Sequence, residues 1–111
     1  MLSIINNERC YLFIMRHPIT LAKNILLVDD EPDVIYAIKN ILEDNGFEVD
    51  SFYDPILVLN YYKVIFYVLV ILDMKMPKMD GFQLYTKISE KDHKVKICFL
   101  TASEMYYEKF R

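Results

Sequence analysis

Residues 67–81 read YVLVILDMKMPKMDG, and this stretch decides the predicted fold. Its first six residues are uncharged and rich in β-branched side chains, a pattern typical of a buried parallel strand. Asp73 follows directly, and then come Pro77, the turn pair Asp80-Gly81 and a helix-like segment from Phe82. We therefore expect Asp73 at the carboxyl end of a buried strand, where open α/β sheets place their chemistry.

Strand patterns alternate with helix patterns on both sides of this stretch. An apolar strand is expected at 24–28, followed by the acids 29–31 and by a helix that begins at Pro32 and ends at Asn45-Gly46. The expected order continues with a half-exposed edge strand at 47–52, a helix at 55–62, the strand 67–72, a helix from 82, a strand at 95–100 and a last helix at 104–111. Such alternation predicts parallel βαβ units with right-handed crossovers.

The composition fits one domain with an ordinary core. The chain has 111 residues, of which 54% are hydrophobic and 26% charged, and its formal net charge is -3. It has no basic block, so we expect no direct binding of nucleic acid. Its two cysteines, Cys10 and Cys98, lie far apart in the sequence. We expect neither a disulfide framework nor a metal site from them. This pattern fits a reducing compartment, so we expect a cytoplasmic protein.

Two apolar runs raise the question of a membrane segment. Residues 10–15 are too few for a span or a signal-peptide core. Residues 56–72 are interrupted by Asn60 and Lys63, and Pro55 favours a helix start, so a helix followed by a strand explains this run better. We expect no membrane association. Residues 1–22 show no clear periodicity and form an extension of unknown role before a domain at 23–111.

Polar side chains follow three of the predicted strands. Asp29 and Asp30 follow the first, Asp73 the third and Thr101 the fourth. Carboxyl ends of parallel strands share one edge, so these groups can converge there. Clustered carboxylates suit Mg²⁺, and a carboxylate beside Mg²⁺ is a plausible nucleophile toward a phosphoryl group. Simpler structural roles remain open for these residues: the first pair can be acids at a helix N-terminus, and Asp73 and Thr101 can be caps.

Three motifs, at 25–32, 72–81 and 99–102, together resemble the receiver domain of two-component response regulators, and the resemblance covers residues 23–109. It implies a flavodoxin-like, doubly wound parallel sheet. It further implies that Asp73 is the phosphoacceptor and Thr101 the switch hydroxyl. Mg²⁺ would be held by Asp29, Asp30, Asp73 and the backbone carbonyl of Lys75. The donor would be a sensor histidine kinase or a phosphotransfer protein, and the domain would be a signalling phosphoprotein rather than an enzyme.

The sequence departs from this family at its carboxyl end. Receivers have a fifth strand that ends in a lysine and is followed by a fifth helix, whereas this chain ends in the fourth helix, where Lys109 does not replace that lysine. The expected strand order is therefore 2-1-3-4. The uncovered sheet edge predicts self-association, marginal stability, or partial cover of the gap by residues 10–15. Because the lysine is missing, a receiver-like binding module that acts without phosphorylation, or a non-functional fragment, is the alternative.

Enzyme classes fit less well. A haloacid-dehalogenase-like phosphatase would need an aspartate at position 31, where this chain has Glu31. Gly46 and Gly81 are the only glycines, so neither a dinucleotide-binding fingerprint nor a phosphate-binding P-loop can be written.

Overall fold

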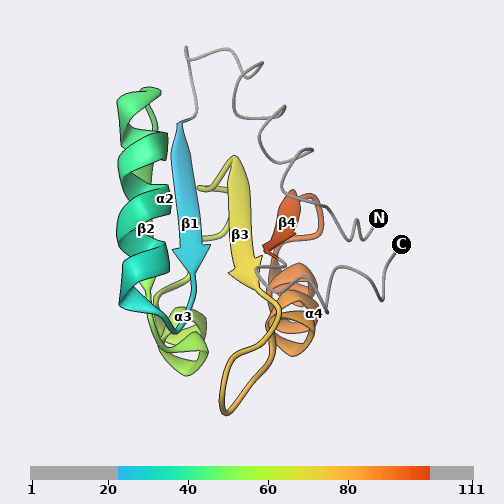
Figure 1. Ribbon diagram of the computed structural model, residues 1–111. Helices are drawn as coiled ribbons and strands as arrows, with labels where there is room; N and C mark the ends of the chain where they lie inside the picture. Colours follow the sequence, from blue (N-terminus) through green and yellow to red (C-terminus); the bar gives the residue numbers. More distant parts are fainter. Residues whose placement is uncertain (1–22, 101–111) are drawn as a thin grey trace, which may run out of the picture.

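The computed structural model describes residues 23–100, and they form a four-stranded parallel sheet with helices on both faces (Figure 1). The strand order is β2-β1-β3-β4, as predicted. The elements in chain order are β1 (Asn24–Val28), α2 (Pro32–Asp44), β2 (Glu48–Phe52), α3 (Pro55–Tyr61), β3 (Leu69–Asp73), α4 (Gly81–Lys91) and β4 (Ile97–Leu100). The predicted extension at 1–22 and the predicted helix at 104–111 lie outside the described residues.

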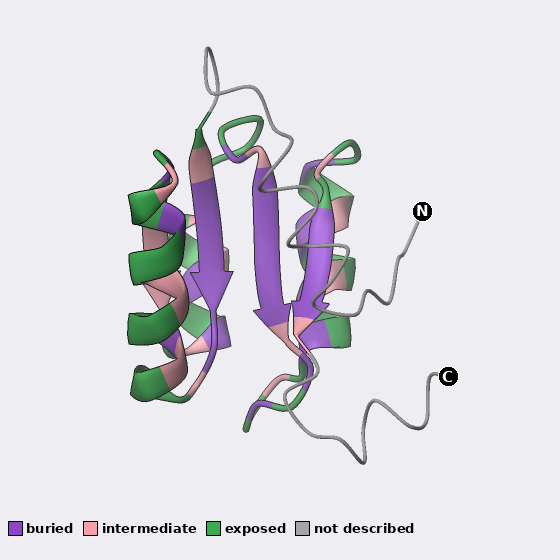
Figure 2. Cartoon of the chain, turned by 45° about the horizontal axis from the view of Figure 1, so that its top comes forward, coloured by how far each residue is buried: buried purple, intermediate pink, exposed green. Residues whose placement is uncertain are grey.

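Two apolar cores lie on opposite faces of the sheet. Successive strand residues point to opposite faces, so β1 sends Ile25 and Leu27 to one side and Leu26 and Val28 to the other. The first pair packs with α2, and the second with α3 and α4. Figure 2 shows β1, β3 and β4 buried along almost their whole length. This two-sided burial explains why these strands are continuous apolar runs.

The end of α2 shows why Asn45-Gly46 stops the helix. Gly46 has φ 91, a left-handed conformation that glycine adopts without strain. Its N–H donates to the Glu43 carbonyl at 3.0 Å, and the N–H of Phe47 donates to the Leu42 carbonyl at 3.1 Å. These two bonds form a Schellman motif, and Leu42 and Phe47 are both buried in the same core. The chain is thereby turned into β2.

Most predicted element positions are confirmed. β2 is an edge strand with partly exposed residues. The apolar run at 56–72 divides into α3, a connection and β3, and within residues 23–100 no helix is long and apolar enough to cross a membrane. Met74 and Met76 are buried in the core, as expected of packing residues.

The cysteine prediction is wrong at Cys98. This residue is buried in β4, as expected of a small core residue, but it is disulfide-bonded. Sequence separation says nothing about the distance between two sulfurs in the fold. The other cysteine of the sequence, Cys10, lies outside the described residues.

Candidate magnesium and phosphoacceptor site

Three carboxylates meet at the carboxyl edge of the sheet. Asp29 directly follows β1, Asp30 comes next, and Asp73 is the last residue of β3. Asp29, Asp30 and Asp73 each offer a carboxylate oxygen within 4.8 Å of the others. The parallel register of β1 and β3 aligns Val28 with Leu72, so the residues that follow them emerge side by side. The predicted convergence of these acids is therefore confirmed.

Backbone hydrogen bonds hold the acids in place. The N–H of Asp29 donates to the Phe52 carbonyl at 3.1 Å, which ties the end of β1 to the end of β2. The Oδ1 of Asp29 accepts from the N–H of Glu31 at 2.8 Å. The Oδ1 of Asp73 accepts from the N–H of Lys75 at 3.2 Å. These two hydrogen bonds orient the carboxylates of Asp29 and Asp73, and the second brings the backbone of Lys75 beside Asp73.

The pKa values of Asp29 and Asp73 are both raised. Burial raises the pKa of Asp73 to about 7, and the negative charges of Asp29 and Asp30 add to the rise, while the Lys75 N–H opposes it. Burial also raises the pKa of Asp29, against the hydrogen bond from Glu31. Both carboxylates are thus buried beside other acids, and a positive charge among them would offset this cost.

A divalent cation would supply that charge, and the residues fit Mg²⁺. The donor set consists of hard carboxylate oxygens, which Mg²⁺ prefers, and two of the three acids, Asp30 and Asp73, are not fully buried, so water can complete the coordination. A cluster of carboxylates with raised proton affinity is stabilised by any cation that replaces the proton. Asp29, Asp30 and Asp73 are therefore the residues that can hold the metal.

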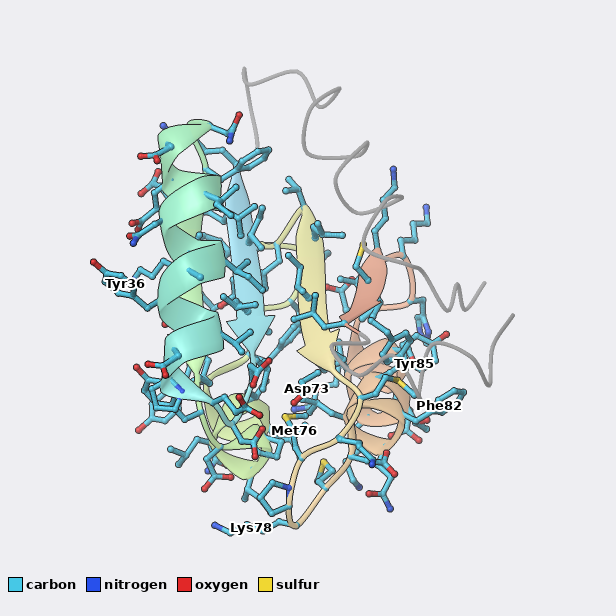
Figure 3. The ribbon with its side chains drawn as sticks, viewed as in Figure 1. Tyr36, Asp73, Met76, Lys78, Phe82 and Tyr85 are labelled. Carbon is cyan, nitrogen blue, oxygen red and sulfur yellow. The ribbon has the colours of Figure 1, made fainter. Side chains whose placement is uncertain are left out.

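The loop after Asp73 is anchored at several points. The N–H of Met74 donates to the Leu100 carbonyl at 3.4 Å, and the N–H of Gly81 donates to the Met74 carbonyl at 3.1 Å. At the loop tip, Lys78 has φ 71 and its Nζ lies 3.2 Å from Asp54 Oδ2, beside the N-terminus of α3. Figure 3 shows Lys78 at this tip, with Asp73 and Met76 nearer the sheet.

Sequence reasoning missed the role of Gly81. A Cβ at this position would overlap the backbone carbonyl oxygen of Asp73 and would lie 3.0 Å from its carbonyl carbon. Only glycine lets the first turn of α4 approach the end of β3 this closely. The pair Asp80-Gly81 is thus more than the predicted turn: Asp80 is the N-cap of α4, and the helix begins at Gly81 rather than Phe82.

Thr101 lies outside the described residues, and its predicted role stays a prediction. Leu100, the residue before it, is the register partner of Asp73 across β3 and β4.

The chain matches a known protein family over most of its length. Residues 25–110 match the model of the response regulator receiver domain. The chain belongs to the response regulator receiver family. Within residues 23–100 this receiver has the order β2-β1-β3-β4, which the resemblance implied for the first four strands.

Relatives and solved structures agree with this assignment. The chain is 35% identical over 85 residues to the transcriptional regulatory protein DltR of Streptococcus agalactiae, covering 77% of this chain and 38% of DltR. It therefore spans about two fifths of that relative. The response regulator TrrA of Thermotoga maritima, solved in complex with Mg²⁺ and BeF, is 35% identical with a TM-score of 0.68, covering 78% of this receiver and 75% of TrrA. TrrA has also been solved in complex with the histidine kinase ThkA, with a TM-score of 0.66, 35% identity and 78% of each chain covered.

Proposed function

We propose that this receiver accepts a phosphoryl group on Asp73 from a sensor histidine kinase or a phosphotransfer protein in the cytoplasm. The observation that carries the proposal is the position of Asp73 at the end of β3, within 4.8 Å of two further carboxylates. Mg²⁺ would be held by Asp29, Asp30, Asp73 and the backbone carbonyl of Lys75. The ion would supply the positive charge that lets an anionic carboxylate approach an anionic phosphoryl group.

The residues of the chain account for the remaining steps. A carboxylate oxygen of Asp73 attacks phosphorus, the P–N bond of the donor phosphohistidine breaks, and its imidazole leaves as the acyl phosphate forms. The N–H of Lys75 orients the Asp73 carboxyl by donating to its Oδ1. We assign the hydroxyl of Thr101 to hydrogen bonding with the transferred group. The domain is in this proposal a signalling protein and not an enzyme.

Phosphorylation from a small donor tests the proposal directly. Incubation of the full chain with Mg²⁺ and acetyl phosphate is expected to add one phosphoryl mass, detected by intact-protein mass spectrometry. Asp73→Asn is expected to abolish the adduct and omission of Mg²⁺ to suppress it. Asp80→Asn is the matched control, because it removes a carboxylate from the same loop while asparagine still caps α4. An absent adduct on folded protein would reject phosphoacceptance and leave the phosphorylation-independent binding module.

We further propose that β4 pairs with a second copy of the chain. Within the described sheet, β4 has a hydrogen-bonded neighbour on one side only, which is β3. The edge of a sheet can serve as a template for pairing with a strand of another chain.

A further inference from the structure

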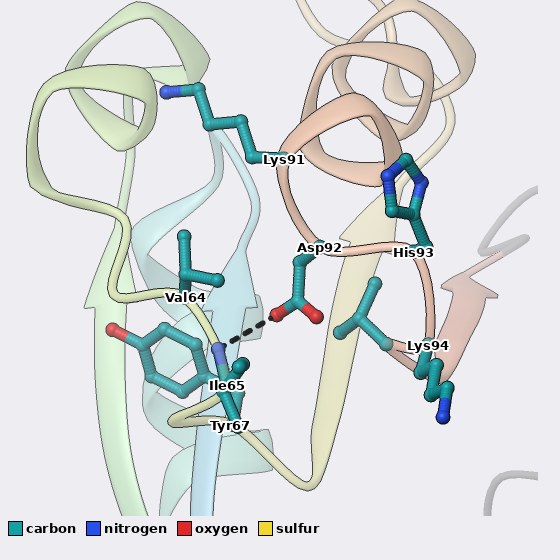
Figure 4. A pocket seen from close by; sticks show the side chains of 8 residues that line it. Val64, Ile65, Tyr67, Lys91, Asp92, His93 and Lys94 are labelled. Atoms are coloured by element: carbon teal, nitrogen blue, oxygen red, sulfur yellow. Dashed lines mark hydrogen bonds between the residues drawn. The ribbon is translucent and has the colours of Figure 1, made fainter.

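A hollow lies at the amino-terminal end of the sheet, at the opposite end from Asp73. Figure 4 shows that it is bordered by the connection from α3 to β3 and by the turn from α4 to β4. Its volume is about 540 Å³. Val64, Ile65, Tyr67 and Val95 contribute apolar surface to its lining. The proposed phosphoryl chemistry uses none of these residues.

Buried Asp92 holds one wall of the hollow in place. This aspartate is 7% exposed and is the C-cap residue that follows α4. Its Oδ2 accepts from the hydroxyl of Tyr62 at 2.9 Å and from the N–H of Ile65 at 3.1 Å. A further bond, from the Tyr67 hydroxyl to Asp50 at 2.8 Å, fixes the same connection from the other side. The wall is therefore formed before any partner arrives.

Ile65 is the unusual residue of this wall. Its φ is 60, a left-handed conformation that β-branched residues strongly disfavour, and the residue is 88% exposed. Glycine or asparagine would suit this backbone better, and a polar side chain would suit the exposure. Val64 and Phe66 beside it are 48% and 37% exposed. The Phe66 ring packs edge-on against Tyr67, with 5.1 Å between the centroids, whereas Val64 and Ile65 add exposed apolar surface at a strained turn. This exposed surface points to a contact with another molecule.

Cationic side chains surround this apolar surface. Lys91 is the last residue of α4, Lys94 lies in the following turn, and both line the hollow together with His93. Lys63 precedes Val64, and its Nζ lies 4.6 Å from the Phe66 ring centroid. The acid in the lining, Asp92, already accepts internal hydrogen bonds. Lys63 lies 3.7 Å from Asp50 Oδ2, and Lys91 donates to the Leu59 carbonyl at 3.2 Å, where it keeps its charge. In the lining itself, Lys91 and Lys94 outnumber the single carboxylate, so the hollow favours a partner's negative charge.

We propose that this hollow docks a segment of a partner protein that presents a bulky apolar side chain flanked by carboxylates. The apolar side chain enters between Ile65 and Val95, and the carboxylates pair with Lys91 and Lys94. A concave site of this volume suits a discrete side chain rather than a flat bilayer surface. Complementary charge sets which segments are accepted. The site is separate from Asp73, so docking and phosphorylation can occur on the same molecule.

A random peptide library displayed on phage, selected on the immobilised full chain, tests the proposal. We expect the enriched peptides to share a bulky apolar residue flanked by Asp or Glu. Ile65→Asn and Lys94→Glu are each expected to weaken binding of a selected synthetic peptide at least tenfold, about 1.4 kcal/mol. Asparagine tolerates the φ of residue 65, so this variant is expected to stay folded, which its thermal melt checks.

Matched controls leave the hollow unchanged. Tyr36→Ser removes an exposed aromatic residue from α2, and Lys87→Glu reverses an exposed charge on α4 that does not line the hollow, so both are expected to bind as the wild type does. Asp73→Asn is also expected to bind the peptide. Enriched peptides without acidic residues would overturn the proposal. So would Ile65→Asn and Lys94→Glu variants that bind the peptide as tightly as the wild type does. Binding to phosphatidylglycerol vesicles without any peptide enrichment would reassign the hollow to a membrane surface.

Discussion

The raised pKa of Asp73 makes the stability of the metal-free receiver depend on pH. The pKa of this carboxyl is about 7 in the folded chain against an ordinary value of 3.8. Between these two values the folded chain holds a proton that the unfolded chain has released. The free energy of unfolding therefore falls as the pH rises from about 4 to about 7. Burial beside Asp29 is the physical cause.

Asp73→Asn is expected to stabilise the metal-free protein at neutral pH. The amide removes one charge from the acidic cluster, and the gain, discounted for the partial exposure of Asp73, is about 1 kcal/mol, or roughly 4–8 °C in Tm. Thermal melts in EDTA across this pH range measure the effect, and the variant is expected to show a shallower pH dependence. Added Mg²⁺ is expected to stabilise the wild type and not the variant. A variant with the wild-type pH dependence would contradict the assignment to Asp73.

Gly81 is a second residue on which the site depends. Gly81→Ala is expected to lower the free energy of unfolding by about 2 kcal/mol, because the new methyl group overlaps backbone atoms of Asp73 that cannot move without displacing β3. Chemical denaturation measures the loss, and a weaker Mg²⁺ affinity of the folded variant reports the displacement of Asp73. Lys87→Ala, on the exposed face of the same helix, is the control and should stay within about 0.5 kcal/mol of the wild type.

At the scale of elements, α4 owes its start to a capping box. The side chain of Asp80 accepts from the N–H of Gln83 at 2.8 Å, and the side chain of Gln83 accepts from the N–H of Asp80 at 3.0 Å. The cap sits directly before Gly81, so it also fixes the helix turn that packs against Asp73. Capping and the geometry of the acidic site are thus coupled in one short segment.

Asp80→Ala is expected to cost about 1 kcal/mol of stability, the usual loss when an N-cap side chain is removed. Asp80→Asn and Asp80→Ser should retain most of it, because both side chains still accept from the helix N-terminus. Denaturation curves of the three variants separate the cap from the charge. Equal losses in all three would mean that charge, and not capping, is the stabilising feature of Asp80.

For the whole molecule, the fold could be predicted from the sequence where a run of several residues is buried together. The apolar runs at 24–28 and 67–72 predict strands covered on both faces, and the second strand begins at Leu69, two residues later than predicted. The acids at the ends of these two strands then share an edge. Features that depend on one close approach were not predictable. Gly81 fits its place only because α4 meets the carbonyl of Asp73, and the left-handed turn at Ile65 opposes every local preference of isoleucine.

Pairing of β4 with a second copy is a property of the whole molecule and predicts a measurable change of mass. Sedimentation velocity over a wide range of concentration is expected to show a monomer that converts to a dimer as concentration rises. Strand pairing rests on backbone hydrogen bonds, which salt screens little, so the dimer should persist at high salt. A single monomeric species at every concentration would contradict the pairing.

The strand order has a consequence for how the domain forms. β1 lies between β2 and β3, yet each of these partners reaches it only after an intervening helix, so no two neighbouring strands are close in sequence. The chain must close large loops before any sheet contact exists, which makes folding slower than in helical domains of this size. Amide protons in the centre of β1 and β3 should therefore exchange with solvent only when the whole sheet comes apart.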